Sequence, residues 1–225
     1  MSLAPFGRLL HAPVRRAASG SERHVAPFRV TIGGVPGQNR SFLLSGALDY
    51  EALAAAEVDA DVFDDVLGSA WVAEYRLLVP AAELVEVDLG TLTYLFDLTA
   101  ERTLGVYGRS APTSAPRPAA RLRGHPSYNG AGRAATDRGH LAAHTIGGGA
   151  DINLVAQDHL LNISGAWRSF ERYAQRHPGT PLAVQARYRA DDDRPHAFVY
   201  SMIRDGRFVY RTFRNAPPRG PRSAG

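Results

Sequence analysis

The run DRGH at residues 137–140 places a carboxylate, a guanidinium and an imidazole side by side. An imidazole titrates near neutral pH, so His140 could take a proton from water and act as a general base. His144 follows four residues later, and this spacing could instead supply two ligands to zinc. Because no Glu follows His140 directly and no third zinc ligand is evident, general-base chemistry is the better interpretation. An ordinary polar turn is the structural alternative.

Charge is strongly segregated along the chain. All 26 basic residues are arginine, whose guanidinium can bind phosphate in a bidentate manner. Residues 49–101 hold 13 acids and one arginine, a net charge of −12, whereas residues 102–225 hold 19 arginines and 8 acids, a net charge of +11. This split predicts a polyanion as the partner of the C-terminal part, with surface solvation as the alternative. The absence of cysteine excludes disulfides, iron–sulfur clusters and thiolate zinc sites.

Four short motifs follow one another between residues 137 and 171. They are DRGH, Asn153 with Gln157 in INLVAQ, Asn162, and Gly165-Ala166-Trp167 followed by Glu171. In their order and spacing they resemble the DNA/RNA non-specific endonucleases. These are the Serratia-type nucleases with a ββα-metal (His-Me) finger, and the similarity is greatest to their compact, toxin-like bacterial branch. The resemblance covers residues 90–213. This chain has one extra residue between Asn162 and the Gly-Ala-Trp motif, and Ala156 where the family has Pro.

The resemblance implies metal-dependent hydrolysis of DNA and RNA with little sequence preference, leaving 5′-phosphates. His140 would be the general base, and Asn162 would hold a hydrated Mg²⁺, with Mn²⁺ as an alternative. A hard cation accepts a neutral amide oxygen and keeps most of its water ligands, so one Asn is sufficient. The cation would act as a Lewis acid and supply a water that protonates the leaving oxygen. Glu171 would hold a metal-bound water and belong to the catalytic set.

The remaining candidate residues bind the substrate or support the site. Arg138 is expected to contact the scissile phosphate as a catalytic residue. Phosphate binding is further expected from Arg133, Arg138, Arg168 and Arg172, and support of the site from Asp137, Asn153 and Gln157. Contacts to phosphate carry no sequence information, which agrees with indiscriminate cutting. For the arginine that stabilises the transition state, the candidates are Arg109, Arg123 and Arg133.

We expect an α+β fold to position these residues. It would consist of a ββα-metal (His-Me finger) nuclease core with an antiparallel sheet, preceded by a small N-terminal α/β accessory region. Alternating apolar residues predict strands over 91–109. Residues 181–190 and 197–213 are also predicted as strands, with a hairpin turn at Asp205-Gly206. Apolar spacing predicts a helix over 165–177 and one or two helices over 49–71. Residues 73–80 and 82–90 are also predicted as strands.

The predicted organisation has four parts. Residues 1–26 are a disordered tail, 27–84 an accessory α/β region that is acidic in its second half, 85–215 the endonuclease domain, and 216–225 a disordered basic tail. Residues 109–136, rich in Pro, Gly, Ala and Arg, are expected to form a long basic loop. The acidic stretch 49–101 is expected to shield the basic surface when substrate is absent.

Two further functional hypotheses remain open from the sequence. The chain could be a catalytically degenerate nuclease fold that binds nucleic acid or protein, or an antibacterial toxin blocked by an immunity or inhibitor protein. No signal peptide, transmembrane helix or membrane partner is predicted. The location is therefore left open between the cytoplasm and export by a specialised secretion system.

Overall fold

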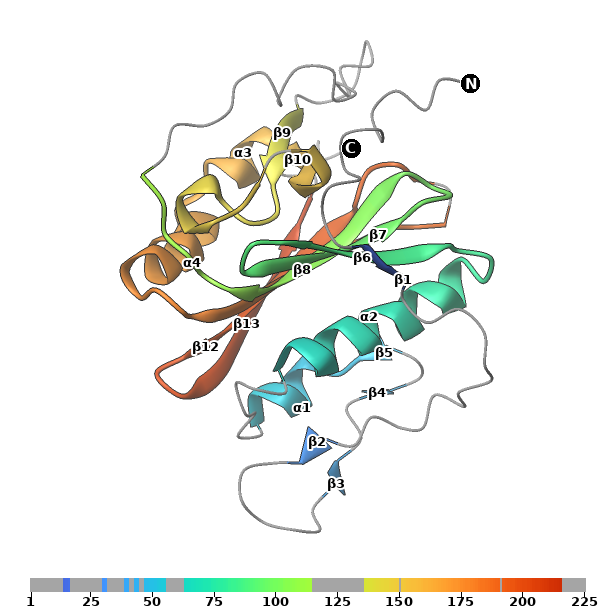
Figure 1. Cartoon of the computed structure of the whole chain (residues 1–225), viewed down its shortest axis with the longest axis horizontal. Coiled ribbons are helices and arrows are strands. Elements are labelled where there is room, and N and C mark those ends of the chain that lie inside the picture. Colours follow the sequence, from blue (N-terminus) through green and yellow to red (C-terminus); the bar gives the residue numbers. More distant parts are fainter. Residues whose placement is uncertain are drawn as a thin grey trace, which may run out of the picture.

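A computed structural model describes residues 14–16, 30–31, 39–40, 43–44, 47–55, 63–114, 136–149, 151–190 and 192–215. These residues form an α+β structure dominated by antiparallel strands (Figure 1). Among the described residues, no helix is both long and apolar enough to pass through a membrane.

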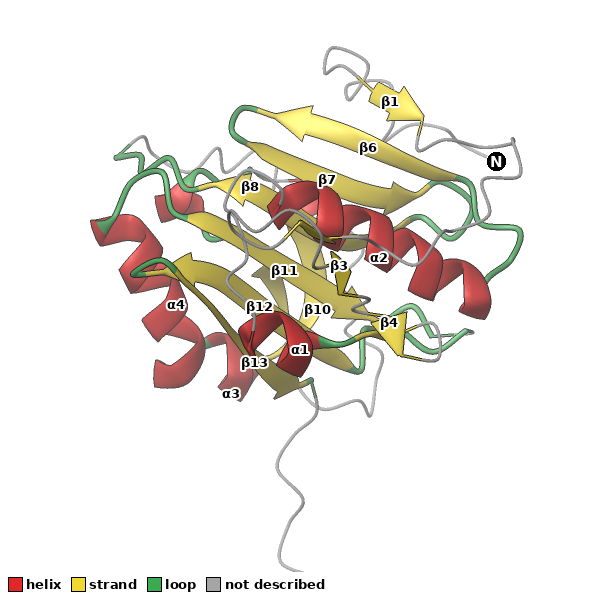
Figure 2. Ribbon diagram, turned by 90° about the horizontal axis from the view of Figure 1, so that it is seen from below, coloured by secondary structure: helices red, strands yellow, loops and turns green. Residues whose placement is uncertain are grey.

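A seven-stranded antiparallel sheet is the centre of the structure, with the order β1-β6-β7-β8-β11-β12-β13 (Figure 2). Its strands are β1 (Val14–Arg16), β6 (Leu84–Leu89), β7 (Leu92–Asp97), β8 (Arg102–Arg109), β11 (Pro181–Arg187), β12 (Ala197–Arg204) and β13 (Arg207–Arg214). The predicted strands over 91–109, 181–190 and 197–213 and the Asp205-Gly206 turn are confirmed. Asp205 and Gly206 adopt φ of 51° and 73°, the positive values that a tight two-residue hairpin requires.

Helices α1 (Tyr50–Ala55) and α2 (Phe63–Leu78) cover one face of this sheet. Leu67, Trp71 and Tyr75 recur at four-residue intervals on α2 and are all buried, which is the spacing of a helix that packs on a sheet. The predicted strand over 73–80 is therefore wrong. Its residues continue α2 as far as Leu78, because the buried spacing extends through Tyr75.

The opposite face carries β9 (Thr136–His140), β10 (Leu154–Asp158), α3 (His159–Asn162) and α4 (Gly165–Arg176), together with 3₁₀ turns at His144–Ile146 and Asp151–Asn153. Helix α4 confirms the predicted helix over 165–177. Its Trp167 packs edge-on against Phe198, Tyr200 and Phe213, at ring-centroid distances of 5.6, 5.3 and 5.2 Å. These contacts fix α4 and the preceding α3 on the sheet.

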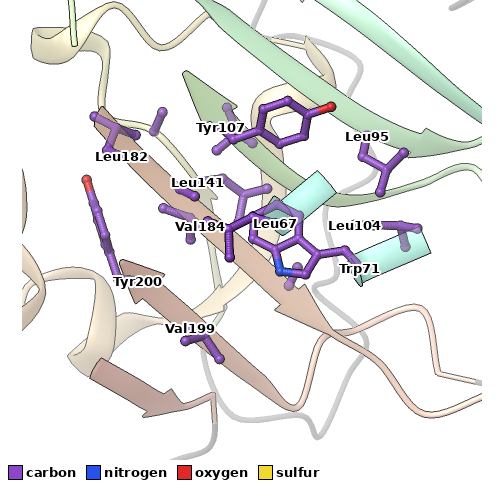
Figure 3. Close-up of a cluster of buried hydrophobic side chains, with 14 of the residues drawn as sticks. Leu67, Trp71, Leu95, Leu104, Tyr107, Leu141, Leu182, Val184, Val199 and Tyr200 are labelled. Atoms are coloured by element: carbon purple, nitrogen blue, oxygen red, sulfur yellow. The ribbon is translucent and has the colours of Figure 1, made fainter. Parts of the chain in front are cut away.

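One core cluster includes buried side chains from both faces, among them Trp71 of α2 and Leu141, which follows β9 (Figure 3). Gly105 lies beneath the Trp71 ring, where a Cβ atom would collide with it. Trp71 lies before the predicted domain boundary at 84/85 and Gly105 after it, so residues from both sides of that boundary share this core.

The described N-terminal pieces are short. Strands β2 (Val30–Thr31) and β3 (Asn39–Arg40) pair with each other, as do β4 (Leu43–Leu44) and β5 (Ala47–Leu48). Three residues of the segment predicted to be a tail form β1 and pair with β6, Val14 lying opposite Val87. The rest of that segment, the tail 216–225 and residues 115–135 of the predicted basic loop lie outside the described residues.

The acidic helices do not lie over the β9–α4 elements. Glu74 of α2 pairs with Arg187 of β11, and Asp64 pairs with Arg109 of β8, on the sheet face that α2 covers. Asp64 and Glu74 thus pair with arginines of the basic C-terminal part, whereas the sheet separates α1 and α2 from β9, α3 and α4. That the acidic stretch shields the basic surface when substrate is absent stays a prediction.

Candidate active site

Strands β9 and β10 form a two-stranded antiparallel ribbon with a regular register. Asp137 lies opposite Gln157, and His140 lies opposite Leu154. Because successive side chains alternate between faces, Asp137 and Gly139 project to one side of the ribbon and Arg138 and His140 to the other. Gly139 gives room to Gln157, since a Cβ atom there would overlap the Gln157 side chain.

The Asp137 carboxylate joins two residues of α3. It accepts a hydrogen bond from Asn162 Nδ2 at 2.8 Å, and His159 Nδ1 lies 3.0 and 3.1 Å from its two oxygens. An ionised carboxylate only accepts hydrogen bonds, so Asn162 must turn its NH₂ group toward Asp137 and His159 must carry a proton on Nδ1. The Asn162 Oδ1 atom therefore points away from Asp137.

The local sequence explains why these two side chains meet Asp137. The Asp158 side chain accepts from the backbone N–H groups of Leu160 and Leu161 and so caps α3 at its start. His159 and Asn162 are three residues apart and hence share a helix face. The same α3 contacts both strands of the ribbon.

The extra residue before the Gly-Ala-Trp motif is accommodated between two helices. Ile163 ends α3 and is 43% exposed, and Ser164 begins α4 by accepting a hydrogen bond from Trp167 N at 3.1 Å. Asn162, rather than Ile163, is thereby left in contact with Asp137.

The loop between β9 and β10 is tied together by Asn153, which is fully buried. Its Oδ1 accepts from Ala142 N at 2.9 Å, and its Nδ2 donates to the carbonyls of Ala142 and Gly149 at 2.8 and 2.7 Å. Gly148 packs against the Ala142 carbonyl so closely that a Cβ atom could not be placed there. These contacts fix the loop that immediately follows His140.

Gln157 is 1% exposed on β10, and its amide has no hydrogen-bond partner within the part of the chain that the structure describes. Its side chain packs over Gly139. A buried polar group without a partner costs free energy, so its amide is suited to bind a water or a ligand atom beside the ribbon.

Glu171 lies on the inner side of α4. Its Oε1 accepts from Trp167 Nε1 at 2.9 Å. Burial raises the pKa of the nearby Tyr200 well above its ordinary value, and the Glu171 charge adds to the rise. Glu171 is thus held by the residue that anchors α4, while a role in binding a metal-bound water stays a prediction.

The predicted arginines fall into three groups. Arg138 on β9 and Arg168 and Arg172 on α4 are exposed. Arg109 pairs with Asp64 at 3.0 Å on the α2 side of the molecule. The predicted Arg133 and the alternative Arg123 lie outside the described residues.

The ribbon geometry separates two of the predicted site residues, His140 and Asn162. His140 ends β9, is partly buried, and projects from the face opposite to Asp137, whereas Asn162 contacts Asp137. The backbones of Asp137 and His140 are three residue steps apart along the strand, which corresponds to roughly 10 Å. His144 is turned toward the Gly148 carbonyl, and the described residues contain no group of three His, Asp or Glu side chains that could hold a metal.

His159 is the residue that the sequence did not single out. The signal was present, since it follows the capping Asp158 and precedes Asn162 by one helical turn. Only the contact with Asp137 distinguishes it from an ordinary surface histidine.

Comparisons with known proteins add little. No family model matches the chain, and no curated protein matches it. Among solved structures, the chain is similar to one described as NucA from Streptococcus agalactiae with magnesium ion bound. That similarity has 16% identity and a TM-score of 0.43, and covers 64% of this chain and 88% of that chain. A likeness this distant shows nothing about the activity of this chain.

Proposed function

We propose that this chain is a metal-dependent, sequence-non-specific endonuclease that hydrolyses phosphodiester bonds of DNA and RNA. The observation that carries the proposal is the Asp137–Asn162 hydrogen bond of 2.8 Å. By holding the amide nitrogen, Asp137 directs the amide oxygen of Asn162 outward as a ligand, and it adds negative charge beside that oxygen. This is the donor chemistry that a hydrated Mg²⁺ or Mn²⁺ prefers.

The residues present fit a hydrated divalent cation, with Asn162 as the ligand and Glu171 as the acceptor for one of its waters. When bound, such a cation stabilises the negative charge that develops on the phosphate and lowers the pKa of a bound water. The proposed donors are the Asn162 amide oxygen and, through water, the Glu171 carboxylate, and so few protein ligands suit a cation that keeps most of its own waters.

The chain's own residues would then carry out the proton transfer and the binding. His140 accepts a proton from the attacking water, and Asn153 keeps the loop behind His140 in place through its three backbone contacts. Asp137 holds Asn162 in its orientation and so acts as a positioning residue. Gln157 packs against Gly139 within the motif and supports its backbone.

Exposed arginines on two elements suit a nucleic-acid backbone. Arg168 and Arg172 are four residues apart and therefore lie on one face of α4, and Arg138 is exposed on β9. Arginine binds phosphate in a bidentate manner, and contacts of this kind are independent of sequence. Arg133, which lies outside the described residues, is proposed to bind phosphate as well.

A plasmid-nicking assay tests this function. Wild-type protein with Mg²⁺ should convert supercoiled plasmid to nicked and linear forms, and the new ends should carry 5′-phosphates that DNA ligase can reseal. Excess EDTA should abolish the conversion. Intact plasmid at micromolar protein with Mg²⁺, accompanied by a retained gel shift, would instead identify a nucleic-acid-binding module without hydrolytic activity.

A further inference from the structure

Two large apolar side chains on α3 are exposed to solvent. Leu160 is 53% exposed and Ile163 is 43% exposed, whereas Leu161 between them packs against the core. Exposed apolar residues are ordinary when they occur singly. These two, however, belong to the same short helix as Asn162, the proposed metal ligand. A nucleic acid whose phosphate reaches a cation on Asn162 must therefore come close to both of them.

The geometry of α3 places these two side chains next to each other. Ile163 ends α3 in a helical conformation, and its backbone N–H donates to the His159 carbonyl. Successive residues of an α-helix are about 100° apart, so Ile163 lies between Leu160 and His159 around the helix axis. The apolar pair therefore borders the side of α3 on which His159 and Asn162 contact Asp137.

A guanidinium group lies beside the apolar pair. Arg172 Nη2 donates to the Gly165 carbonyl at 3.4 Å, so this side chain turns back along α4 to a position two residues from Ile163. The described residues leave the space around Gly165 open, since an added Cβ atom there would meet nothing within 4 Å. An apolar surface next to a guanidinium suits a nucleotide, in which an uncharged sugar adjoins a phosphate.

We propose that Leu160 and Ile163 form an apolar contact surface for the sugar of the nucleotide next to the scissile phosphate. This inference rests on the nucleic-acid binding that the proposed function requires. The net charge of +11 over residues 102–225 favours a polyanion over other occupants of this surface. Contacts to sugar carry no sequence information, and apolar contacts release no counterions. The pair therefore adds affinity that depends neither on base sequence nor on salt.

The salt dependence of DNA binding separates this apolar contact from the ionic ones. Binding of a short fluorescent DNA duplex is measured by anisotropy in EDTA, which prevents cleavage, over a range of salt concentrations. The double variant Leu160→Gln, Ile163→Thr should bind about tenfold more weakly at every salt concentration, with an unchanged slope of log Kd against log salt. Arg172→Gln should also bind more weakly, but its slope should fall by about 0.9, because one phosphate contact is lost.

A matched control and distinct outcomes complete the experiment. Leu77→Gln changes a 68% exposed leucine of α2, on the opposite face of the sheet, and should bind as wild type does. All variants should keep the wild-type melting temperature. Wild-type affinity in the α3 double variant would overturn the inference and leave a protein as the occupant of this surface. A lowered melting temperature would overturn it too, because the pair would then be covered within the folded chain. If wild-type protein does not bind the duplex even at low salt, the proposed function fails as well.

Discussion

The two faces of the central sheet use their polar groups differently. On the α2 face, Trp71 Nε1 donates to Tyr50 Oη at 2.9 Å, and Tyr50 Oη donates to Gln185 Oε1 at 3.0 Å. Gln185 Nε2 in turn donates to Glu74, which also pairs with Arg187. This chain of contacts links α1, α2 and β11 and is largely buried.

On the other face, the polar contacts converge on a carboxylate that remains partly open to solvent. The Asp137 side chain is 32% exposed, and its partners His159 and Asn162 belong to a four-residue helix rather than to the sheet. Arg138 of β9 and Arg168 and Arg172 of α4 are exposed on the elements that form this side of the molecule. The comparison teaches that polar groups on the α2 face join elements of the fold and are largely buried, whereas the polar groups around Asp137 on the other face stay partly exposed to solvent.

The largest effect should come from the proposed general base. His140→Ala should reduce the Mg²⁺-dependent nicking rate by about 10²- to 10⁴-fold, because the attacking water loses its proton acceptor. Its thermal unfolding should match that of wild type, since the ring is only partly buried. A variant that nicks plasmid at the wild-type rate would remove His140 from the site.

On the α2 face, a substitution with a comparable free-energy cost should lower the stability of the fold and leave the nicking rate unchanged. Trp71 is 1% exposed and packs against Tyr107 and Gly105. Trp71→Ala should lower the free energy of unfolding by about 3–5 kcal/mol, as measured by urea denaturation. Below its unfolding transition, the nicking rate per folded molecule should stay at the wild-type value. A specific loss of rate in the folded protein would contradict the separation of the two faces.

A smaller effect is expected from the residue that orients Asn162. Asp137→Asn removes the charged acceptor for Asn162 and His159 and should lower the nicking rate by about 10- to 100-fold. Higher Mg²⁺ concentrations should recover part of the loss. The exposed Asp205, which lies at the β12–β13 turn, provides the control, and Asp205→Asn should retain the wild-type rate.

The smallest expected effect is on the pH dependence of stability. It concerns His196 and not the side chains of Asp137, His159 and Asn162. Burial lowers the pKa of His196 from its ordinary 6.5, and the charges of Arg189 and Arg187 lower it further. The unfolded chain therefore binds this proton more readily, so stability falls as the pH drops below about 6.5 toward the lowered pKa. His196→Asn should flatten the fall in urea midpoint between about pH 7.5 and about pH 5.5. An equally steep fall in the variant would assign the dependence to other groups.

Much of the C-terminal architecture could be predicted because local patterns and packing agree there. Strands β12 and β13 are rich in apolar residues and are joined by an Asp-Gly turn, and α4 has its aromatic residues on one face. The prediction for residues 73–80 is wrong because their apolar content suits a strand equally well, and only burial against the sheet selects the helix. The sequence likewise could not place His159, since its contact with Asp137 spans 22 residues and depends on how α3 crosses the ribbon.

The central claim is that Asn162, oriented by Asp137, holds the cation on which hydrolysis depends. The most direct measurement is the nicking rate of wild type and Asn162→Ala as a function of Mg²⁺ concentration. The account predicts that the variant loses about 10²-fold or more of its rate at Mg²⁺ levels that saturate wild type, while its melting temperature is retained. A variant that nicks plasmid at the wild-type rate with the same Mg²⁺ dependence would contradict it.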